Sequence, residues 1–368
     1  MTLFENSCIN TGRQCELDWA RGLAVFFMIL VHIKLELPGF PFENLYSKVI
    51  EFVGSPLAAP TFMILLGAGI VYSRHHEPKN MVKHGLKLLA LHYVLNFVAF
   101  GLPYLTLFIQ TGDAEYSEDF FNYLFCVDIL AFAGLTFLFF ALKEKLQWEN
   151  VHLVLVTLVL VSLNYLITWA MNDLWAIQGI GLFVKSNDYS YFPFLSWIGY
   201  PVMGYIFGKH LIRCADKKRF YKYLFAFSIL IVAAITLGSY KYDFDIWSMH
   251  FGPDDYYYQD FIQYILVGGI CFAWISILYL LTRIKFLGFL GKLLARWSKN
   301  VTAIYFAQWF IIGWISIFFK DYFPAEPLIN ISVGIIVVIF SDVLAVLYLR
   351  VSEINKKRQF EIHPRGGM

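Results

Sequence analysis

Two ionisable side chains, Arg21 and His32, bracket ten apolar residues near the start of the chain. Arginine binds anionic groups such as phosphate, and histidine transfers protons near neutral pH because its unperturbed pKa is about 6.5. On a helix, the eleven-residue separation spans about 16 Å and leaves the two side chains about 20° apart around the axis. A membrane span takes about 20 residues, so at least one of the pair lies within the bilayer. The pair predicts an anion site and a proton-transferring group on one polar face.

Asp18 extends this polar face, because it lies about 60° from Arg21 around the same helix. A charge at the centre of a bilayer costs at least about 2.5 kcal/mol, so such residues normally face a bundle interior or a watery cavity. A second interpretation stays open. Arg21 would then reach the headgroups as a cytoplasmic anchor, and His32 would be an interfacial residue.

Three further polar groups fall within apolar runs. Asp128 is placed about 12 Å inside the fourth apolar run, counted at about 1.5 Å per residue, and it is predicted to pair with His32 or another inward cation. His92 and Asn96 share a helix face one turn apart, as a substrate-contacting pair or as a hydrogen-bonded core pair.

The elements that carry these residues are predicted to be membrane helices. The 368 residues are 59% apolar and 15% charged, whereas a soluble domain carries about 25% charged residues. Runs of spanning length predict an all-α polytopic protein of about ten transmembrane helices, centred near residues 26, 61, 93, 131, 160, 201, 230, 270, 309 and 339. They form one domain, 1–368, with a cytoplasmic N-terminus at 1–16 and a cytoplasmic tail at 351–368. The five cysteines are scattered along the chain and form no CxxC motif, so we expect no metal site.

The connections between these runs alternate in charge. Every second one is rich in Lys and Arg, as in GKHLIRCADKKRFYK, while those between are neutral or acidic, as in QTGDAEYSEDF. This is the positive-inside pattern, and it places both termini in the cytoplasm. The net charge of +2 gives no indication of nucleic-acid binding. We therefore expect an integral, multi-pass protein whose main partner is the bilayer.

The first apolar run, LDWARGLAVFFMILVH, resembles the opening of the transmembrane acyltransferase superfamily. Type 3 acyltransferases carry Asp-x-x-Arg-Gly and Arg-x10-His there, matched by Asp18, Arg21, Gly22 and His32. GSPLAAPTFMILLGAGIVYS and CVDILAFAGLTFL are similar to the second- and fourth-helix blocks. SYFPFLSWIGYPVMGYIFGK is similar to the sixth-helix block of the heparan-α-glucosaminide N-acetyltransferase-like branch.

The resemblance implies transfer of an acyl group, usually acetyl, from cytoplasmic acyl-CoA to a carbohydrate or glycan on the other side. His32 would act as general base, or as nucleophile through an acyl-His intermediate, with Asp128 supporting it. Tyr305 and Gln308 would donate to the thioester oxygen, although Gln308 could equally form a hydrogen bond between helices. Trp197 would contact substrate. Cations on the cytoplasmic side would meet the phosphates of the donor, acetyl-CoA: Arg21, Arg74, Lys83, Lys87, Lys209, Arg213, Lys285, Arg296 and Lys299.

We expect the inner membrane of a bacterium, and a homodimer is compatible with this class. His75, His76 and His84 are expected to be solvated. Aromatic side chains in the outer loops would either lie at the level of the lipid headgroups or stack on a sugar ring. These residues are Tyr256, Tyr257, Tyr258, Trp175 and Trp247. A secondary transporter of a small polar or anionic solute is the main alternative, although the sequence shows no clear inverted repeat. A haem protein would need paired axial histidines, for which only His32 and His92 are candidates.

Overall fold

The computed structural model describes residues 2–37, 45–74, 77–170, 179–185, 188–242, 256–257, 259–324 and 326–362. Every regular element in these ranges is helical, as predicted, and two β-bridges occur singly. The α-helices are α1 (Cys15–Glu36), α2 (Leu45–Gly54), α3 (Ala59–Tyr72), α4 (Pro78–Asn96), α5 (Leu102–Thr111), α6 (Ala114–Leu124), α7 (Ile129–Lys145), α8 (Asn150–Ala170), α9 (Phe194–Trp197), α10 (Gly199–Leu211), α11 (Lys217–Lys241), α13 (Phe261–Leu281), α14 (Gly288–Lys299), α15 (Val301–Phe319) and α16 (Pro327–Ile362). A π-helix, Phe97–Gly101, joins α4 to α5.

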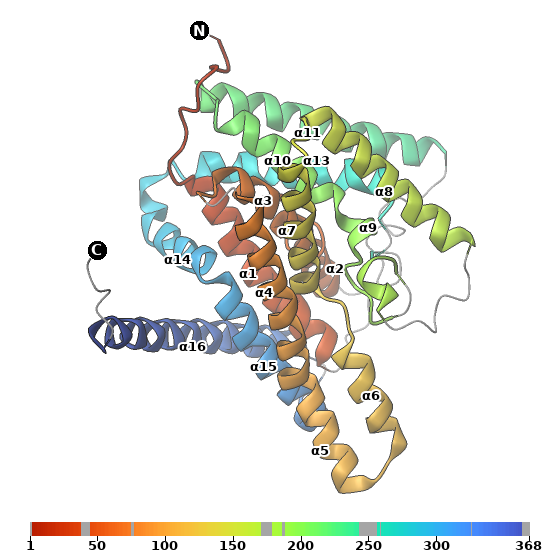
Figure 1. Ribbon diagram of the computed structural model, residues 1–368. Helices are drawn as coiled ribbons and strands as arrows, with labels where there is room; N and C mark the ends of the chain where they lie inside the picture. Colours follow the sequence, from red (N-terminus) through yellow and green to blue (C-terminus); the bar gives the residue numbers. More distant parts are fainter. Residues whose placement is uncertain are drawn as a thin grey trace.

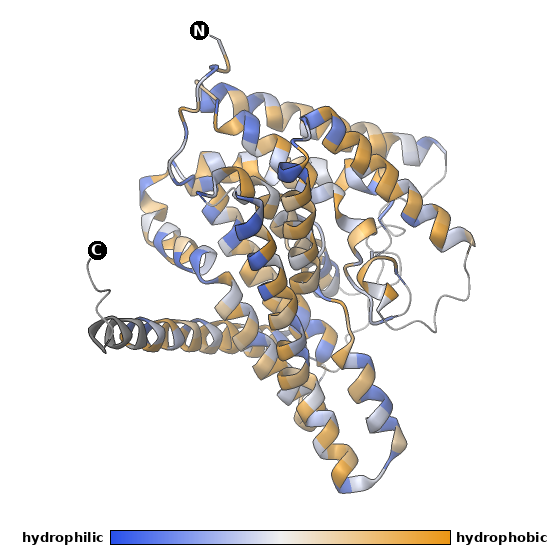
Figure 2. Cartoon of the chain, in the orientation of Figure 1, coloured by the Kyte–Doolittle hydropathy of each residue, from blue (hydrophilic) through white to orange (hydrophobic). Residues whose placement is uncertain are grey.

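Within the described ranges, seven helical segments are long and apolar enough to cross a membrane, which confirms an all-α, multi-pass membrane protein. They include seven of the ten predicted centres, and the other three fall in α1, α7 and α10. The helix α1 has the length but carries five charged residues, whereas α7 has 17 residues and α10 has 13. Figure 2 shows apolar residues along the helices and hydrophilic ones gathered near their ends.

The helix α1 lies at the centre of the bundle, where it contacts α2, α3, α13, α14, α15 and α16. In Figure 1, α1, α3, α4 and α7 occupy the middle, while α5 and α6 project from the bundle at the end away from the N-terminus. The acidic stretch QTGDAEYSEDF was expected to be a connection, but it folds mostly as α6. Asp113 caps this helix by accepting from the backbone N–H of Glu115.

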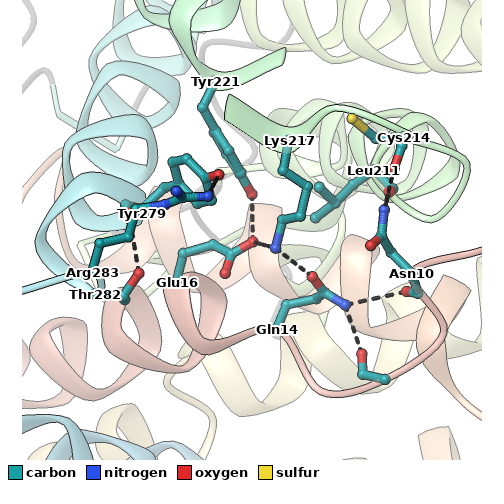
Figure 3. Close-up of polar contacts among 11 residues, drawn as sticks. Asn10, Gln14, Glu16, Leu211, Cys214, Lys217, Tyr221, Tyr279, Thr282 and Arg283 are labelled. Atoms are coloured by element: carbon teal, nitrogen blue, oxygen red, sulfur yellow. Dashed lines mark hydrogen bonds and ion pairs between the residues drawn. The ribbon is translucent and has the colours of Figure 1, made fainter. Parts of the chain in front are cut away.

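Polar contacts fix the beginning of α1 against α11 (Figure 3). The carboxylate of Glu16 is buried, accepts a 2.9 Å hydrogen bond from the Tyr221 hydroxyl, and forms an ion pair with Lys217. Gln14 accepts a second bond from Lys217 at 2.7 Å. A buried carboxylate is tolerated because it is paired and hydrogen-bonded in this way. These contacts hold the turn of α1 that leads into Arg21.

Close helix packing sets the walls of the bundle interior. A Cβ at Gly67 of α3 would lie 1.8 Å from the carbonyl oxygen of Pro201 in α10, and one at Gly85 of α4 would lie 2.7 Å from that of Gly134 in α7. Small residues allow such approaches between membrane helices. The pairs α3–α10 and α4–α7 are therefore fixed at backbone contact.

The sequence-based placement of Asp128 inside a helix is wrong. The helix α7 begins at Ile129, and Asp128 is its extended N-cap, accepting from the Ile129 backbone N–H at 2.6 Å. The physical reason is a long-range backbone contact, in which Val127 N–H donates to Tyr189 O at 2.7 Å and Tyr191 N–H donates to Val127 O at 3.0 Å. This pairing takes residue 127 out of the helical path.

Candidate functional site

A cavity of about 680 Å³ lies between α1, α3, α4, α7 and α15. This is within the usual size range of small-molecule sites. Its walls are mostly apolar, with a small set of polar side chains: Arg21, Ser73, Asn80, Lys83, His84, Lys87, Thr302 and Tyr305. We call it the first recess.

The mouth of the first recess is formed by the first turns of α4. Lys83, His84 and Lys87 are exposed there, and the His84 ring meets the Phe137 ring edge-on with centroids 4.5 Å apart. His84 is exposed, as predicted, and it also lines the mouth of the first recess. Three groups that can carry positive charge make this opening suitable for phosphate groups.

Arg21 lies deeper in the first recess. Its Nη2 donates to the carbonyl oxygen of Leu65 at 3.1 Å, and a guanidinium has further N–H donors to offer. Gly69 lies alongside, where an added Cβ would be 3.7 Å from Arg21 Nη2. On the other side, Gly22 packs so closely on α14 that a Cβ would lie 2.5 Å from Leu294 O. Arg21 is therefore held between α3 and α14 with its remaining donors available to a ligand.

Tyr305 of α15 and Ile129 of α7 line the inner end of the first recess. The Tyr305 hydroxyl donates to the carboxylate of Asp128. Along α1, the lining reaches Met28, which is one helical turn, about 6 Å, short of His32.

His32 lies one helical turn beyond Met28 on α1 and is not among the residues that line the first recess. Its Nδ1 is 3.0 Å from Gln308 Nε2, and its ring stacks on Trp309 with centroids 4.1 Å apart. One expectation is corrected here. Asp128 meets Tyr305 rather than His32, because the non-helical turn before α7 directs it toward α15.

A row of aromatic rings leads from His32 to the projecting hairpin of α5 and α6. Trp309 meets Phe100 at 5.3 Å, Phe100 stacks on Tyr123 at 4.8 Å, and Tyr123 stacks on Tyr104 at 5.1 Å between centroids. These rings come from α15, the π-helix, α6 and α5. His32 is therefore joined by packing to the end of the bundle opposite the mouth.

The family model for the catalytic domain of heparan-alpha-glucosaminide N-acetyltransferase matches residues 13–250, nearly two thirds of the chain. The chain belongs to this family. No curated protein and no solved structure matches it. The match confirms the resemblance to the heparan-α-glucosaminide N-acetyltransferase-like branch, and membership makes the protein a membrane acetyltransferase by family. The matched range, 13–250, includes Arg21, His32 and Asp128, whereas Tyr305 and Gln308 lie beyond this range.

Three residues predicted to bind the donor or the substrate, Arg74, Lys209 and Trp197, lie outside the lining of the first recess. Arg74 is exposed just after α3, and Lys209 lies 5.3 Å from the centre of the Tyr205 ring. Trp197 is completely buried and packs against Phe192. Their positions make them a surface cation, a ring-stacked cation and a core residue.

His92 and Asn96 also lie outside the first recess but hold the turn that precedes Asp128. The Asn96 side-chain amide donates to Leu124 O at 3.2 Å and to Cys126 O at 2.8 Å. His92 Nε2 is 3.4 Å from the same amide. These contacts favour the interpretation of His92 and Asn96 as a hydrogen-bonded core pair. The pair supports the turn that leads to Asp128.

Sequence reasoning passed over several groups near this site. Glu36 is four residues beyond His32, which places it on the same face of α1 one turn further out. That spacing was the available signal. No sequence signal placed Trp309 beside His32, because it comes from a helix far along the chain. Trp175, Trp247, Tyr258, His75 and His76 lie outside the described residues.

Proposed function

We propose that this protein transfers an acetyl group from cytoplasmic acetyl-CoA to a hydroxyl or amine of a carbohydrate acceptor at the opposite membrane face. The single observation that carries the proposal is the first recess. It has a cationic mouth at the end with the basic connections, apolar walls, Arg21 inside, and an inner end one helical turn from His32.

The donor fits this recess from its phosphates inward. Lys83, His84 and Lys87 would meet the phosphates of coenzyme A at the mouth, where the positive-inside rule puts the cytoplasm. The apolar walls would take the flexible arm that carries the thioester. Arg21 would bind a polar group along that arm through the N–H donors that Leu65 does not use.

The transfer needs a base at the inner end. A neutral imidazole of His32 would accept the proton as the acceptor oxygen or nitrogen attacks the thioester carbon. The carbon–sulfur bond then breaks, and the proton is passed on to the departing thiolate, so that coenzyme A leaves as a thiol. Attack by His32 itself, giving an acyl-imidazole that the acceptor then cleaves, uses the same groups.

Gln308 would select the tautomer of His32. For Nε2 to keep its lone pair as a base, Nδ1 must carry the proton and donate to the Gln308 carbonyl oxygen. Rotating the Gln308 amide by half a turn exchanges its nitrogen and oxygen. The Gln308 carbonyl oxygen then takes the place of Gln308 Nε2, 3.0 Å from His32 Nδ1.

Tyr305 lines the inner end of the first recess, where its hydroxyl is bonded to Asp128. Once released from Asp128, the Tyr305 hydroxyl would be free to donate to the thioester oxygen, where negative charge develops. On the far side, the rings of Tyr123 and Tyr104 would offer apolar faces to a sugar.

The test measures transfer of labelled acetyl by the purified full-length protein, with release of coenzyme A as a second readout. We expect His32→Ala to abolish both, while His152→Ala, an exposed histidine on α8, leaves them unchanged. Full turnover by correctly inserted His32→Ala would rule out the assignment of the base. A wild-type protein that neither binds acetyl-CoA nor releases coenzyme A would rule out the proposed function.

A further inference from the structure

A second recess, of about 440 Å³, lies between α14, α16 and Arg13, which precedes α1. Its charged lining is Arg13, Lys292, Arg296, Lys299, Arg350 and Glu353. Except for Arg13, these residues lie beyond the part of the chain that matches the family, and none lines the first recess. We propose that the second recess binds the phosphate headgroup of an anionic phospholipid from the adjoining leaflet.

The second recess keeps positive charge after its internal ion pairs are counted. Arg13 pairs with Asp18, and Arg296 pairs with Asp342. The hydrogen bond to Asp18 raises the pKa of Arg13, so its guanidinium stays charged. Among the described residues, Lys292, Lys299 and Arg350 form no ion pair, and Glu353 offsets one of the three. The surplus of positive charge calls for an anionic ligand.

The helix α14 combines this charge with an apolar surface. Lys292, Arg296 and Lys299 follow one another at four and three residues, which places them on one face. Phe289, seven residues before Arg296 and therefore on the same face, is 82% exposed. Leu290 is also exposed, and Phe286, just before α14, is 93% exposed. A cationic face next to exposed aromatic and aliphatic side chains is typical of a helix lying at a membrane surface.

The helix α16 supplies the other wall. Val346 and Leu349 line the second recess, and the exposed neighbours Leu347 and Val351 continue an apolar surface beyond it. A soluble phosphate compound would gain nothing from these apolar flanks, whereas the acyl chains of a lipid would pack on them. Basic pockets between helices on the cytoplasmic side are a recurrent form of headgroup site. Charge and apolar surface together favour the lipid.

A bound headgroup would also bear on the position of α1. The guanidinium of Arg13 donates to Ala295 O at 2.9 Å, and Ser298 donates to Asp18 at 2.7 Å. The backbone of Leu294 packs directly on Gly22, next to Arg21. Holding α14 through the second recess would therefore steady the turn of α1 that carries Arg21.

The test titrates the purified full-length protein with phosphatidylglycerol or phosphatidylcholine and counts bound lipid by native mass spectrometry. We expect Lys292→Ala with Lys299→Ala to weaken phosphatidylglycerol binding about 10- to 30-fold and to leave phosphatidylcholine binding unchanged. The matched control is Lys218→Ala with Lys222→Ala, two exposed lysines at the start of α11. Replacing Lys292 and Lys299 by Arg should preserve binding, and thermal unfolding checks the fold of each variant.

Equal phosphatidylglycerol binding by the alanine pair and the wild type would overturn the proposal, as would an equal loss in the control pair. Inorganic phosphate and coenzyme A serve as soluble competitors. If coenzyme A displaces the lipid and loses affinity in the Lys292 and Lys299 variant, the second recess belongs to the donor and the lipid proposal fails. Lipid binding is measured without turnover, so its outcome is independent of the proposed function.

Discussion

The two recesses of this protein differ in what surrounds their positive charges. In the first recess, three groups at the mouth lead into an apolar interior that holds a single arginine, Arg21. In the second recess, five cations lie near the surface, and two of them are paired with carboxylates. The first is therefore poorer in charge but enclosed by five helices.

This difference teaches that enclosure, rather than the number of cations, distinguishes a site for chemistry from a site for surface binding. Charges in contact with water are screened by salt and contribute little each. A group within apolar walls interacts more strongly because the local dielectric constant is lower. The first recess also ends near His32, Gln308 and Asp128. At the second recess, the carboxylates of Asp18 and Asp342 are already paired with Arg13 and Arg296.

Filling the first recess with a large side chain is expected to have the largest effect on acetyl transfer. Gly69→Phe would project a ring into it, and we expect turnover to fall by at least about 100-fold, as for other displaced substrates. Gly69→Ala is the control, because its Cβ meets only Arg21 Nη2 at an ordinary 3.7 Å. The measurement is labelled acetyl transfer together with acetyl-CoA binding. Undiminished transfer by Gly69→Phe would show that the donor does not enter here.

The next effect concerns the single cation inside. Arg21→Ala should raise the KM for acetyl-CoA about 10- to 100-fold, since a hydrogen bond to a charged group contributes about 1.5–3 kcal/mol. Lys299→Ala in the second recess should change this KM by less than about 2-fold. Steady-state kinetics with both variants measures the contrast, and equal effects would remove the distinction between the recesses.

A smaller effect, on turnover rather than on donor binding, is expected at the inner end. Gln308→Leu removes the partner of His32 Nδ1, and we expect kcat to fall about 10-fold while the KM for acetyl-CoA stays within about 2-fold. Gln308→Glu keeps an acceptor for Nδ1 and should retain more activity than the leucine variant. A change confined to KM would indicate that Gln308 contacts the donor instead.

The smallest effect is expected at the mouth, where the cations are exposed. Lys83→Ala with Lys87→Ala should raise the KM for acetyl-CoA about 3- to 10-fold, and the difference from wild type should shrink as salt increases. The pair Lys218→Ala and Lys222→Ala is the control and should leave this KM unchanged. Kinetics at low and high ionic strength decides the point, and a salt-independent difference would contradict a screened, exposed site.

Much of the fold could be predicted, because long apolar runs and the charge of their connections are local properties of the chain. The ten predicted centres all lie in helices, including the short α10 around residue 201. One failure occurs where the backbone partner is distant: Val127 pairs with the segment at 189–191, which ends the helical path before Asp128. The other is local, since the acidic stretch after Gly112 forms a helix capped by Asp113.

The candidate site was only partly predictable for the same reason. The spacing of Arg21 and His32 indicated a polar face on α1, and Arg21 does line a cavity. Spacing along one helix says nothing of which neighbour faces each turn. In the structure, Arg21 meets Leu65 of α3, whereas His32 meets Gln308 of α15.

The sequence by itself determined the membrane class, the helices, the basic and acidic ends, and membership of an acetyltransferase family. These properties follow from hydropathy, charge and motifs, each contained within one stretch of chain. Only the tertiary structure decided that Tyr305 holds Asp128, that His32 packs against Gln308 and Trp309, and that the cations divide between two recesses. These facts depend on which helices pack together, and that choice is made by close contacts such as Gly22 on Leu294, between residues far apart in sequence.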